Sequence, residues 1–151
     1  MRSATLREAF LASSYGCAGA RGQLCVTGPA SRPAWSAPGQ PWAILTAWNP
    51  QAQRVPAGQN AQAQAALHRE VACWSPLPGW NAEGPWREDT LIVRGTPLQE
   101  AVRLGYAYGQ VAVVWGVGRR AALVWLDGPA AQIERFWWRP LPDAAGYTAR
   151  L

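Results

Sequence analysis

The chain of 151 residues contains no lysine, so all 14 of its basic side chains are arginines, and its formal net charge is +5. An arginine excess suggests a phosphate-bearing partner, because the guanidinium group binds phosphate through two parallel hydrogen bonds. The arginines are spread along the sequence, however, and only Arg119 and Arg120 are adjacent. A phosphate-binding surface needs its cations on one face. The sequence therefore predicts that nucleic-acid binding is weak and salt-dependent at most, and the codon bias of a GC-rich genome is the preferred explanation of the composition.

Histidine and cysteine are also scarce. The three cysteines, Cys17, Cys25 and Cys73, include no Cys-x-x-Cys pair, so neither a disulfide framework nor a zinc site is indicated. The single histidine, His68, has no serine or cysteine motif with a matching acid near it, which leaves a catalytic triad unsupported. We therefore expect no metal and no cofactor.

Long apolar runs are absent as well. No segment approaches the roughly 20 apolar residues that span a bilayer. Arg7, Glu8, Ser13 and Ser14 interrupt the first fifteen residues, where a signal peptide would be apolar. The chain is expected to be soluble and cytoplasmic. Its length and its 49% of hydrophobic residues predict one folded domain over residues 1–151.

The sequence does contain a regular succession of apolar segments. An N-terminal helix is predicted over residues 6–12 and a hairpin over residues 15–26, followed by a Pro- and Ser-rich loop. Helical spacing predicts a second helix from Asn60 to residue 71, and Thr96 with Pro97 predicts the start of a third through a capping box. Strands are predicted at residues 42–48, 73–77, 89–94, 111–115 and 121–126.

The order strand, helix, strand, strand, helix, strand predicts an α+β fold of the ferredoxin-like, split β-α-β type. We expect a sheet of about five mostly antiparallel strands with helices on one face, and an N-terminal helix and hairpin as an extension. The core would span residues 42–126, with residues 1–41 as the extension. Residues 127–151 would form a tail that packs back over the sheet.

Tryptophan is abundant, with ten residues. Four of them lie in predicted strands and are expected in the core. Four others lie in loops or at strand ends, where an indole ring could meet a ligand, as in proteins that bind single-stranded nucleic acid. These four are Trp35, Trp74, Trp80 and Trp86.

Several short segments together resemble a known bacterial family. These segments are Thr46-Ala47-Trp48-Asn49-Pro50, then Asn60, then Trp86-Arg87-Glu88, and finally Gly109-Gln110-Val111-Ala112. They are similar to the family catalogued as domain of unknown function 3293, and the resemblance extends over residues 6–126. Ser13-Ser14 and Ala61 depart from the pattern. The family has no established activity, so the resemblance implies candidate residues without a reaction.

Two hypotheses follow for these candidate residues. In the first, they form a pocket for a nucleotide-like or other polar small molecule, with Glu88 as the one group able to act as a general acid or base. Its ligand-binding residues would be Thr46, Trp48, Asn49, Asn60, Trp86 and Gln110. In the second, the chain is an interaction or nucleic-acid-associated module, and the same residues are only caps and turns.

The first hypothesis makes a geometric prediction. In a split β-α-β sheet, the end of the first strand lies beside the starts of the third and fourth strands. Asn49 follows the first strand, Glu88 precedes the third, and Gln110 precedes the fourth. The first helix would start at the same edge and bring Asn60 there. These four side chains, distant in sequence, are therefore expected to meet.

Overall fold

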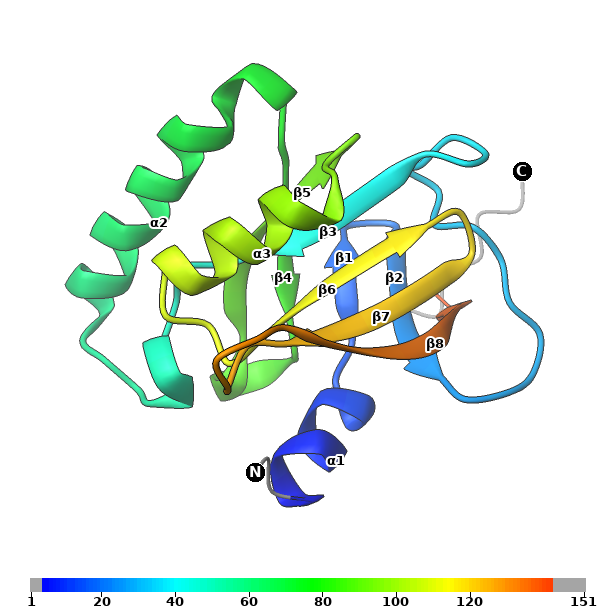
Figure 1. Ribbon diagram of the computed structural model, residues 1–151, viewed down its shortest axis with the longest axis horizontal. Coiled ribbons are helices and arrows are strands. Elements are labelled where there is room, and N and C mark those ends of the chain that lie inside the picture. The colour runs from blue at the N-terminus through cyan, green and yellow to red at the C-terminus, as the bar shows by residue number, and fades with distance from the viewer. Residues whose placement is uncertain (1–3, 143–151) are drawn as a thin grey trace.

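The computed structural model describes residues 4–142, which form one eight-stranded antiparallel sheet and three α-helices (Figure 1). The strand order is β1-β2-β8-β7-β6-β3-β5-β4. The helices are α1 (Ala4–Ala12), α2 (Ala57–Val71) and α3 (Leu98–Ala107). The strands are β1 (Tyr15–Cys17), β2 (Ala20–Cys25), β3 (Pro41–Leu45), β4 (Leu77–Asn81), β5 (Glu88–Arg94), β6 (Ala112–Val117), β7 (Arg120–Trp125) and β8 (Gln132–Pro140).

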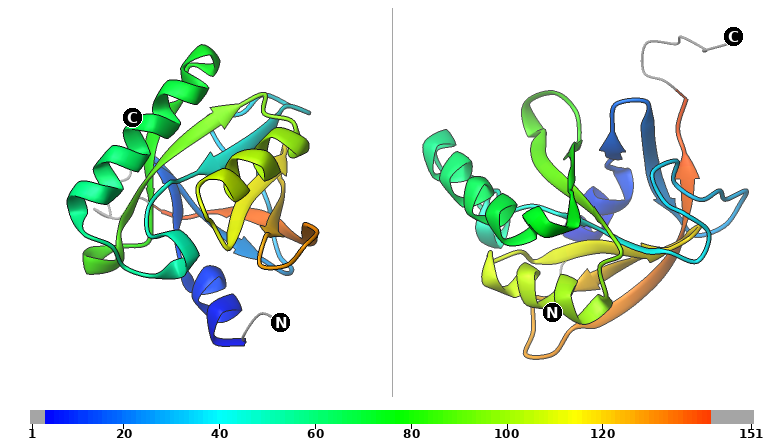
Figure 2. Two further views of the ribbon diagram at one scale, coloured as in Figure 1. Left: turned by 60° about the vertical axis from the view of Figure 1, so that its left-hand side comes forward. Right: turned by 90° about the horizontal axis from the view of Figure 1, so that it is seen from above.

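The sheet curls until its edge strands β1 and β4 approach each other, which produces a nearly closed barrel (Figure 2). The Ala82 N–H donates to the Ser14 carbonyl at 2.8 Å across this seam. The buried Arg21 guanidinium donates to the Gly16 and Trp80 carbonyls on either side of it. The approach requires glycine, because a Cβ atom added to Gly79 would lie 2.4 Å from the Gly16 oxygen.

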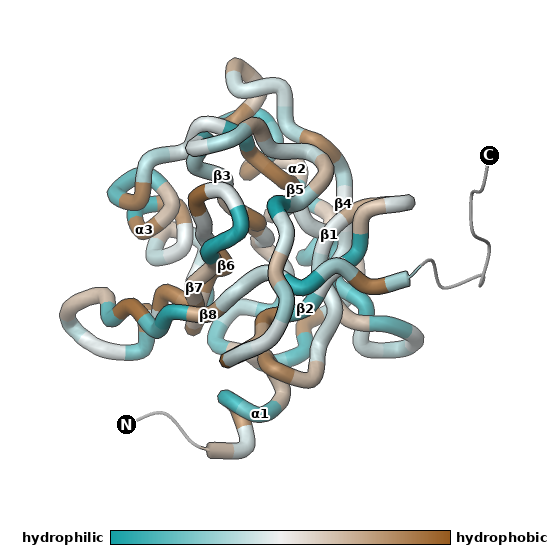
Figure 3. The backbone as a smooth tube through the Cα atoms, turned by 90° about the vertical axis from the view of Figure 1, so that its right-hand side faces the viewer, coloured by the Kyte–Doolittle hydropathy of each residue, from teal (hydrophilic) through white to brown (hydrophobic). Residues whose placement is uncertain are grey.

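Two apolar cores lie on opposite faces of the curled sheet, and β3 contributes to both. Trp42 and Ile44 point into the barrel, whereas Ala43 and Leu45 pack outward against the core that α2 and α3 cover. The prediction of a strand buried on both faces is confirmed here. Figure 3, in which brown marks hydrophobic residues, shows brown along the central strands β6 and β7. Within residues 4–142, no helix has both the length and the apolar character needed to cross a bilayer.

Three tryptophans from distant parts of the chain fill the barrel interior. Trp35, Trp42 and Trp138 contact one another edge to face, with ring centroids 5.3–5.7 Å apart. At one end of the barrel, Phe10 of α1 packs edge to face against Trp125 at 5.4 Å. α1 therefore covers that end of the barrel (Figure 1).

The predicted five-stranded ferredoxin-like fold was wrong. β1, β2 and β8 join the same sheet and curl it, and the expected C-terminal tail instead supplies β8 between β2 and β7. The reason is that Phe136 and Trp138 on alternate positions of β8 are buried, so this segment contributes a face of the core. β3 still pairs antiparallel with both β5 and β6, which is the arrangement that the geometric prediction used.

Three local predictions were also wrong. The second strand begins at Leu77 rather than Cys73, because a 3-10 turn ends at the left-handed Ser75 (φ 53°) first. The Thr96 hydroxyl donates to the Val93 carbonyl at 2.9 Å instead of capping α3, whose N-cap is Pro97. Asn60 does not cap α2 either, since that helix begins at Ala57.

Candidate small-molecule site

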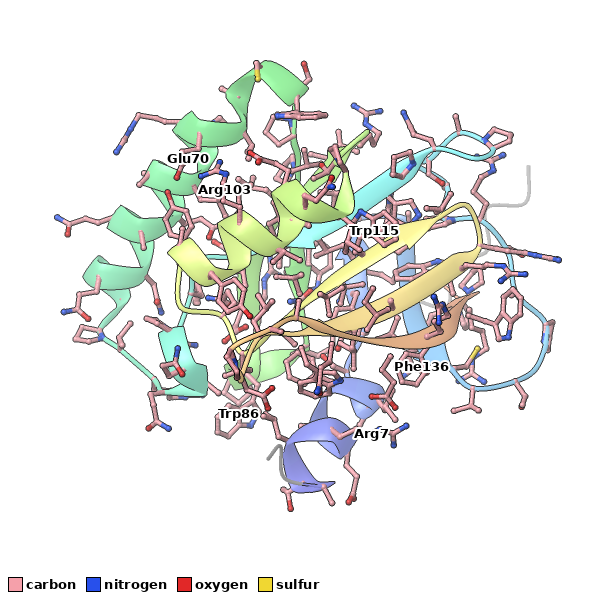
Figure 4. The ribbon with its side chains drawn as sticks, in the orientation of Figure 1. Arg7, Glu70, Trp86, Arg103, Trp115 and Phe136 are labelled. Atoms are coloured by element: carbon pink, nitrogen blue, oxygen red, sulfur yellow. The ribbon has the colours of Figure 1, made fainter. Side chains whose placement is uncertain are left out.

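A cavity of about 1210 Å³ opens at the end of the barrel that α1 covers. Residues of α1, the segment after β3, the loop between β4 and β5, and the start of β6 line it. Figure 4 shows Trp86 at this end, near α1. All seven residues proposed from the sequence contribute to the lining, namely Thr46, Trp48, Asn49, Asn60, Trp86, Glu88 and Gln110.

Asn49 connects three of these residues through direct hydrogen bonds. Its backbone N–H donates to Asn60 Oδ1 at 2.9 Å, and Asn60 Nδ2 donates back to Asn49 Oδ1 at 3.0 Å. Asn49 Nδ2 in turn donates to Glu88 Oε2 at 2.8 Å. Asn49 adopts the left-handed conformation (φ 49°), which asparagine tolerates better than most residues. The prediction that Asn49, Asn60 and Glu88 meet is confirmed.

Gln110 and Thr46 hold the segment after β3 in place. Gln110 Nε2 donates to the carbonyls of Trp48 at 3.0 Å and Tyr108 at 3.2 Å. The Thr46 hydroxyl donates to the Asp89 carbonyl at 2.7 Å and accepts from the Trp48 N–H at 3.0 Å. Gln110 thus joins the same cluster, and its amide, like those of Asn49 and Asn60, is engaged by the protein itself.

Glu88 differs from these amides because it is a carboxylate, and no described cationic side chain lies within ion-pair distance of it. Burial raises the pKa of the Glu88 carboxyl, and the Asn49 hydrogen bond and the more distant Arg54 oppose that increase. The site can therefore accept hydrogen bonds at Glu88 or exchange a proton there, whereas the surrounding amides do not titrate.

Sequence reasoning missed several polar residues of the lining, among them Asn81 and Arg54. Asn81 lies directly opposite Glu88 in the β4–β5 pair, and its buried Oδ1 has no hydrogen-bond partner within the described chain. The indole Nε1 of Trp48 is likewise buried without a described partner. Asn81 faces Glu88 because of the β4–β5 register. The strand predicted at residues 73–77 ends before Asn81, so the sequence did not place it there.

The rim of the cavity carries a stacked cation and ring. The Arg54 guanidinium lies 4.3 Å from the Trp86 ring centroid and donates to the Pro85 carbonyl at 2.7 Å. Trp86 is 68% exposed, so its ring is accessible from solvent. Among the described residues, no three His, Cys, Asp or Glu side chains are grouped closely enough to hold a metal ion.

The segment that contains this cluster matches a known family. Residues 45–113 match the family model described as Protein of unknown function (DUF3293). This part of the chain is similar to DUF3293. The match confirms the family predicted from the sequence, over a shorter range than expected. All seven proposed site residues fall within the DUF3293 match, whereas α1, β1, β2, β7 and β8 lie outside it.

Two further comparisons give no relative to argue from. No curated protein and no solved structure matches the chain. DUF3293 is a family of unknown function, so the similarity assigns no activity to this chain.

Proposed function

We propose that the chain binds a nucleotide-like or other polar small molecule in the cavity at the α1 end of the barrel, with Glu88 as its central contact. The observation that supports this most is the half-buried Glu88 carboxylate, which has one amide partner and no ion pair among the described residues. Burying a carboxylate costs free energy unless hydrogen bonds or a cation compensate. Such groups are concentrated at functional sites, where a ligand supplies the compensation.

The polar groups of the lining indicate the chemistry of that ligand. Glu88 and Asn81 are neighbouring acceptors, which suits a ligand edge with amino or imino N–H groups. Trp48 Nε1 is a donor for an acceptor atom on the same ligand. Arg54, stacked on Trp86 at the rim, suits a phosphate or a carboxylate. An amino-substituted base with a phosphate group carries all three features.

Glu88 is also the residue to which we assign any proton transfer at this site. Burial raises its pKa, and Glu88 is the titratable carboxyl of the proposed set, so it can give or take a proton where the amides cannot. Asn49 is a positioning residue in this proposal, because it holds the carboxylate through Nδ2. The predicted cytoplasmic location belongs to the same proposal.

The experiment is a thermal-shift screen of the purified chain with adenosine, cytidine and guanosine and their monophosphates. We expect at least one probe to raise the Tm, because a ligand that binds only the folded state stabilises it. Glu88→Gln should remove that increase, while Glu8→Gln, the same change on the exposed face of α1, should keep it. Native mass spectrometry of the freshly purified chain would identify a co-purified compound.

Two results would contradict the proposal. One is that no probe shifts the Tm and no compound co-purifies. The other is an equal shift in the Glu88→Gln variant and in the unchanged chain. Either would favour the alternative in which Asn49, Asn60 and Gln110 serve only to hold turns, an alternative that their internal hydrogen bonds support.

A further inference from the structure

A second, smaller hollow of about 410 Å³ lies on the outer face of β6, β7 and β8, away from the cavity at the α1 end. Side chains at alternate positions of these strands point outward, while the others fill the barrel. Trp115 of β6, labelled in Figure 4, lines the hollow together with Ala122 of β7 and Trp137 of β8. The lining is thus largely apolar, and aromatic at both edges.

Arginines that are far apart in the sequence gather around this hollow. In the β7–β8 pair, Arg120 lies opposite Trp137 and Ala122 lies opposite Arg135. The guanidinium groups of Arg119 and Arg120 lie 5.5 Å and 5.1 Å from the centroid of the Trp137 ring. Arg139, two residues beyond Trp137, points to the same face, where it donates to Gln23 Oε1 at 2.9 Å.

Within residues 4–142, no Asp or Glu forms an ion pair with any of these four arginines. The outward positions of the described strands β6, β7 and β8 hold no Asp or Glu. Glu134 of β8 points to the other side, where it pairs with Arg7 at 2.6 Å. The face is therefore positively charged and complementary to a polyanion.

We infer that this face binds single-stranded nucleic acid, independently of the ligand proposed for the cavity. Guanidinium groups contact phosphates, and a base stacks on Trp137 or on the arginine planes that already lie over it. The apolar hollow receives the face of an unpaired base. A duplex keeps its base faces stacked inside the helix, so it cannot use the hollow. The sequence concealed this face, because only two of its four arginines are adjacent.

The first test measures fluorescence anisotropy of labelled dT12 and U12 strands over a series of NaCl concentrations. Four phosphate contacts predict a slope of log K against log salt of about −3 for single strands. Replacing two arginines, Arg120→Gln with Arg135→Gln, should weaken binding about ten-fold and reduce the slope by roughly half. The control double variant Arg69→Gln with Arg94→Gln removes the same charge elsewhere and should change affinity less than two-fold.

The second test separates stacking from charge alone, using heparin as a polyanion without bases. Trp137→Leu keeps apolar volume but removes the ring, and should weaken oligonucleotide binding about ten-fold while heparin binding stays unchanged. Trp137→Phe should retain most of the affinity. Equal losses for heparin and oligonucleotide would show a general polyanion surface and overturn the inference.

Two results of the arginine variants would also overturn the inference. One is equal affinity of the Arg120/Arg135 and Arg69/Arg94 double variants for dT12. The other is the absence of binding at low salt. This comparison decides the question even if a Trp137 variant fails to fold.

Discussion

The residues around the cavity have two different roles: some fix the segment after β3, and Glu88 is proposed to contact a ligand. The side-chain amides of Asn49 and Asn60 hydrogen-bond to each other's residues, and that of Gln110 donates to the Trp48 carbonyl. These hydrogen bonds fix the segment after β3. Glu88 accepts a hydrogen bond from the Asn49 amide and lines the cavity. The sequence could predict this set, because the family resemblance singles out these residues and β3 pairs with both β5 and β6 as expected. It could not predict Asn81, whose position depends on which residues of β4 pair with β5.

The raised pKa of Glu88 leads to a prediction for stability against pH. In the folded chain Glu88 binds its proton more tightly than in the unfolded chain, so the free energy of unfolding falls as pH rises through the interval between the two pKa values. Below the unfolded pKa both states are protonated and no penalty remains. Glu88→Gln removes this titration, and Gln still offers an oxygen to Asn49.

Urea unfolding of both chains between pH 4 and pH 7 checks this expectation. The variant should gain stability over the unchanged chain as pH rises, and Glu8→Gln should show no such trend. The burial of Glu88 would be contradicted if the free energy of unfolding of Glu88→Gln, relative to the unchanged chain, stayed constant with pH. It would also be contradicted if the variant lost stability relative to the unchanged chain as pH rises.

At the scale of elements, the seam between β1 and β4 closes the barrel without a regular strand ladder in the described part of the chain. Regular ladders connect all the other neighbouring strands, whereas here an Ala82–Ser14 backbone bond and the Arg21 guanidinium bridge the edges. Trp80 lies between two arginines, with the Arg21 and Arg87 guanidinium groups 4.3 Å and 4.4 Å from its ring centroid. Side chains, more than strand pairing, therefore hold the barrel closed.

We predict that Gly79→Ala opens this seam, because its Cβ would meet the Gly16 carbonyl oxygen at 2.4 Å. Overpacking against backbone costs about 1–3 kcal/mol, and the free energy of unfolding should fall by that amount. Hydrogen exchange at the Ala82 amide should accelerate more than exchange in β6 or β7.

The matched control is Gly58→Ala, since a Cβ atom at Gly58 meets nothing within 4 Å. It lies in α2, where alanine is favoured over glycine by up to about 1 kcal/mol, so this variant should be more stable. Equal effects of the two substitutions would show that the seam is not under steric constraint.

Local patterns predicted most of these elements but not how the sheet closes. α1, the β1–β2 hairpin, β3, β5, β6 and β7 lie close to the predicted ranges, because apolar periodicity and glycine turns are local signals. The adjacent rings of Phe136, Trp137 and Trp138 predict a tail that packs over the sheet, whereas the segment Gln132–Pro140 forms a strand. Its strand character comes from two long-range partners, β2 and β7, which no local pattern specifies.

At the scale of the whole molecule, β8 connects the N-terminal hairpin to the rest of the sheet. It pairs with β2 on one side and with β7 on the other, and Trp138 contributes to the tryptophan cluster in the barrel. The family match at residues 45–113 ends before this strand. Residues outside the match therefore turn the sheet into a barrel.

We predict that a chain truncated after Gly128 does not fold cooperatively. It would lose β8 and leave β2 and β7 with unpaired edges and Trp42 without its Trp138 neighbour. Loss of one large aromatic side chain from a core alone costs about 3–5 kcal/mol, which is comparable to the whole stability of many domains. Thermal unfolding followed by circular dichroism should show a broad, shallow transition. A sharp transition near the Tm of the full chain would contradict the central role of β8.

The β2–β8 pairing also affects the order of events during biosynthesis. Cys25 and Trp137, paired neighbours in the sheet, are 112 residues apart in the chain. At roughly 5–20 residues per second, a ribosome needs about 6–22 seconds to add that stretch. During that interval the nascent N-terminal hairpin has no partner for its outer edge. Until β8 arrives, the edge of β2 therefore exposes backbone N–H and C=O groups that a strand of another chain could pair with.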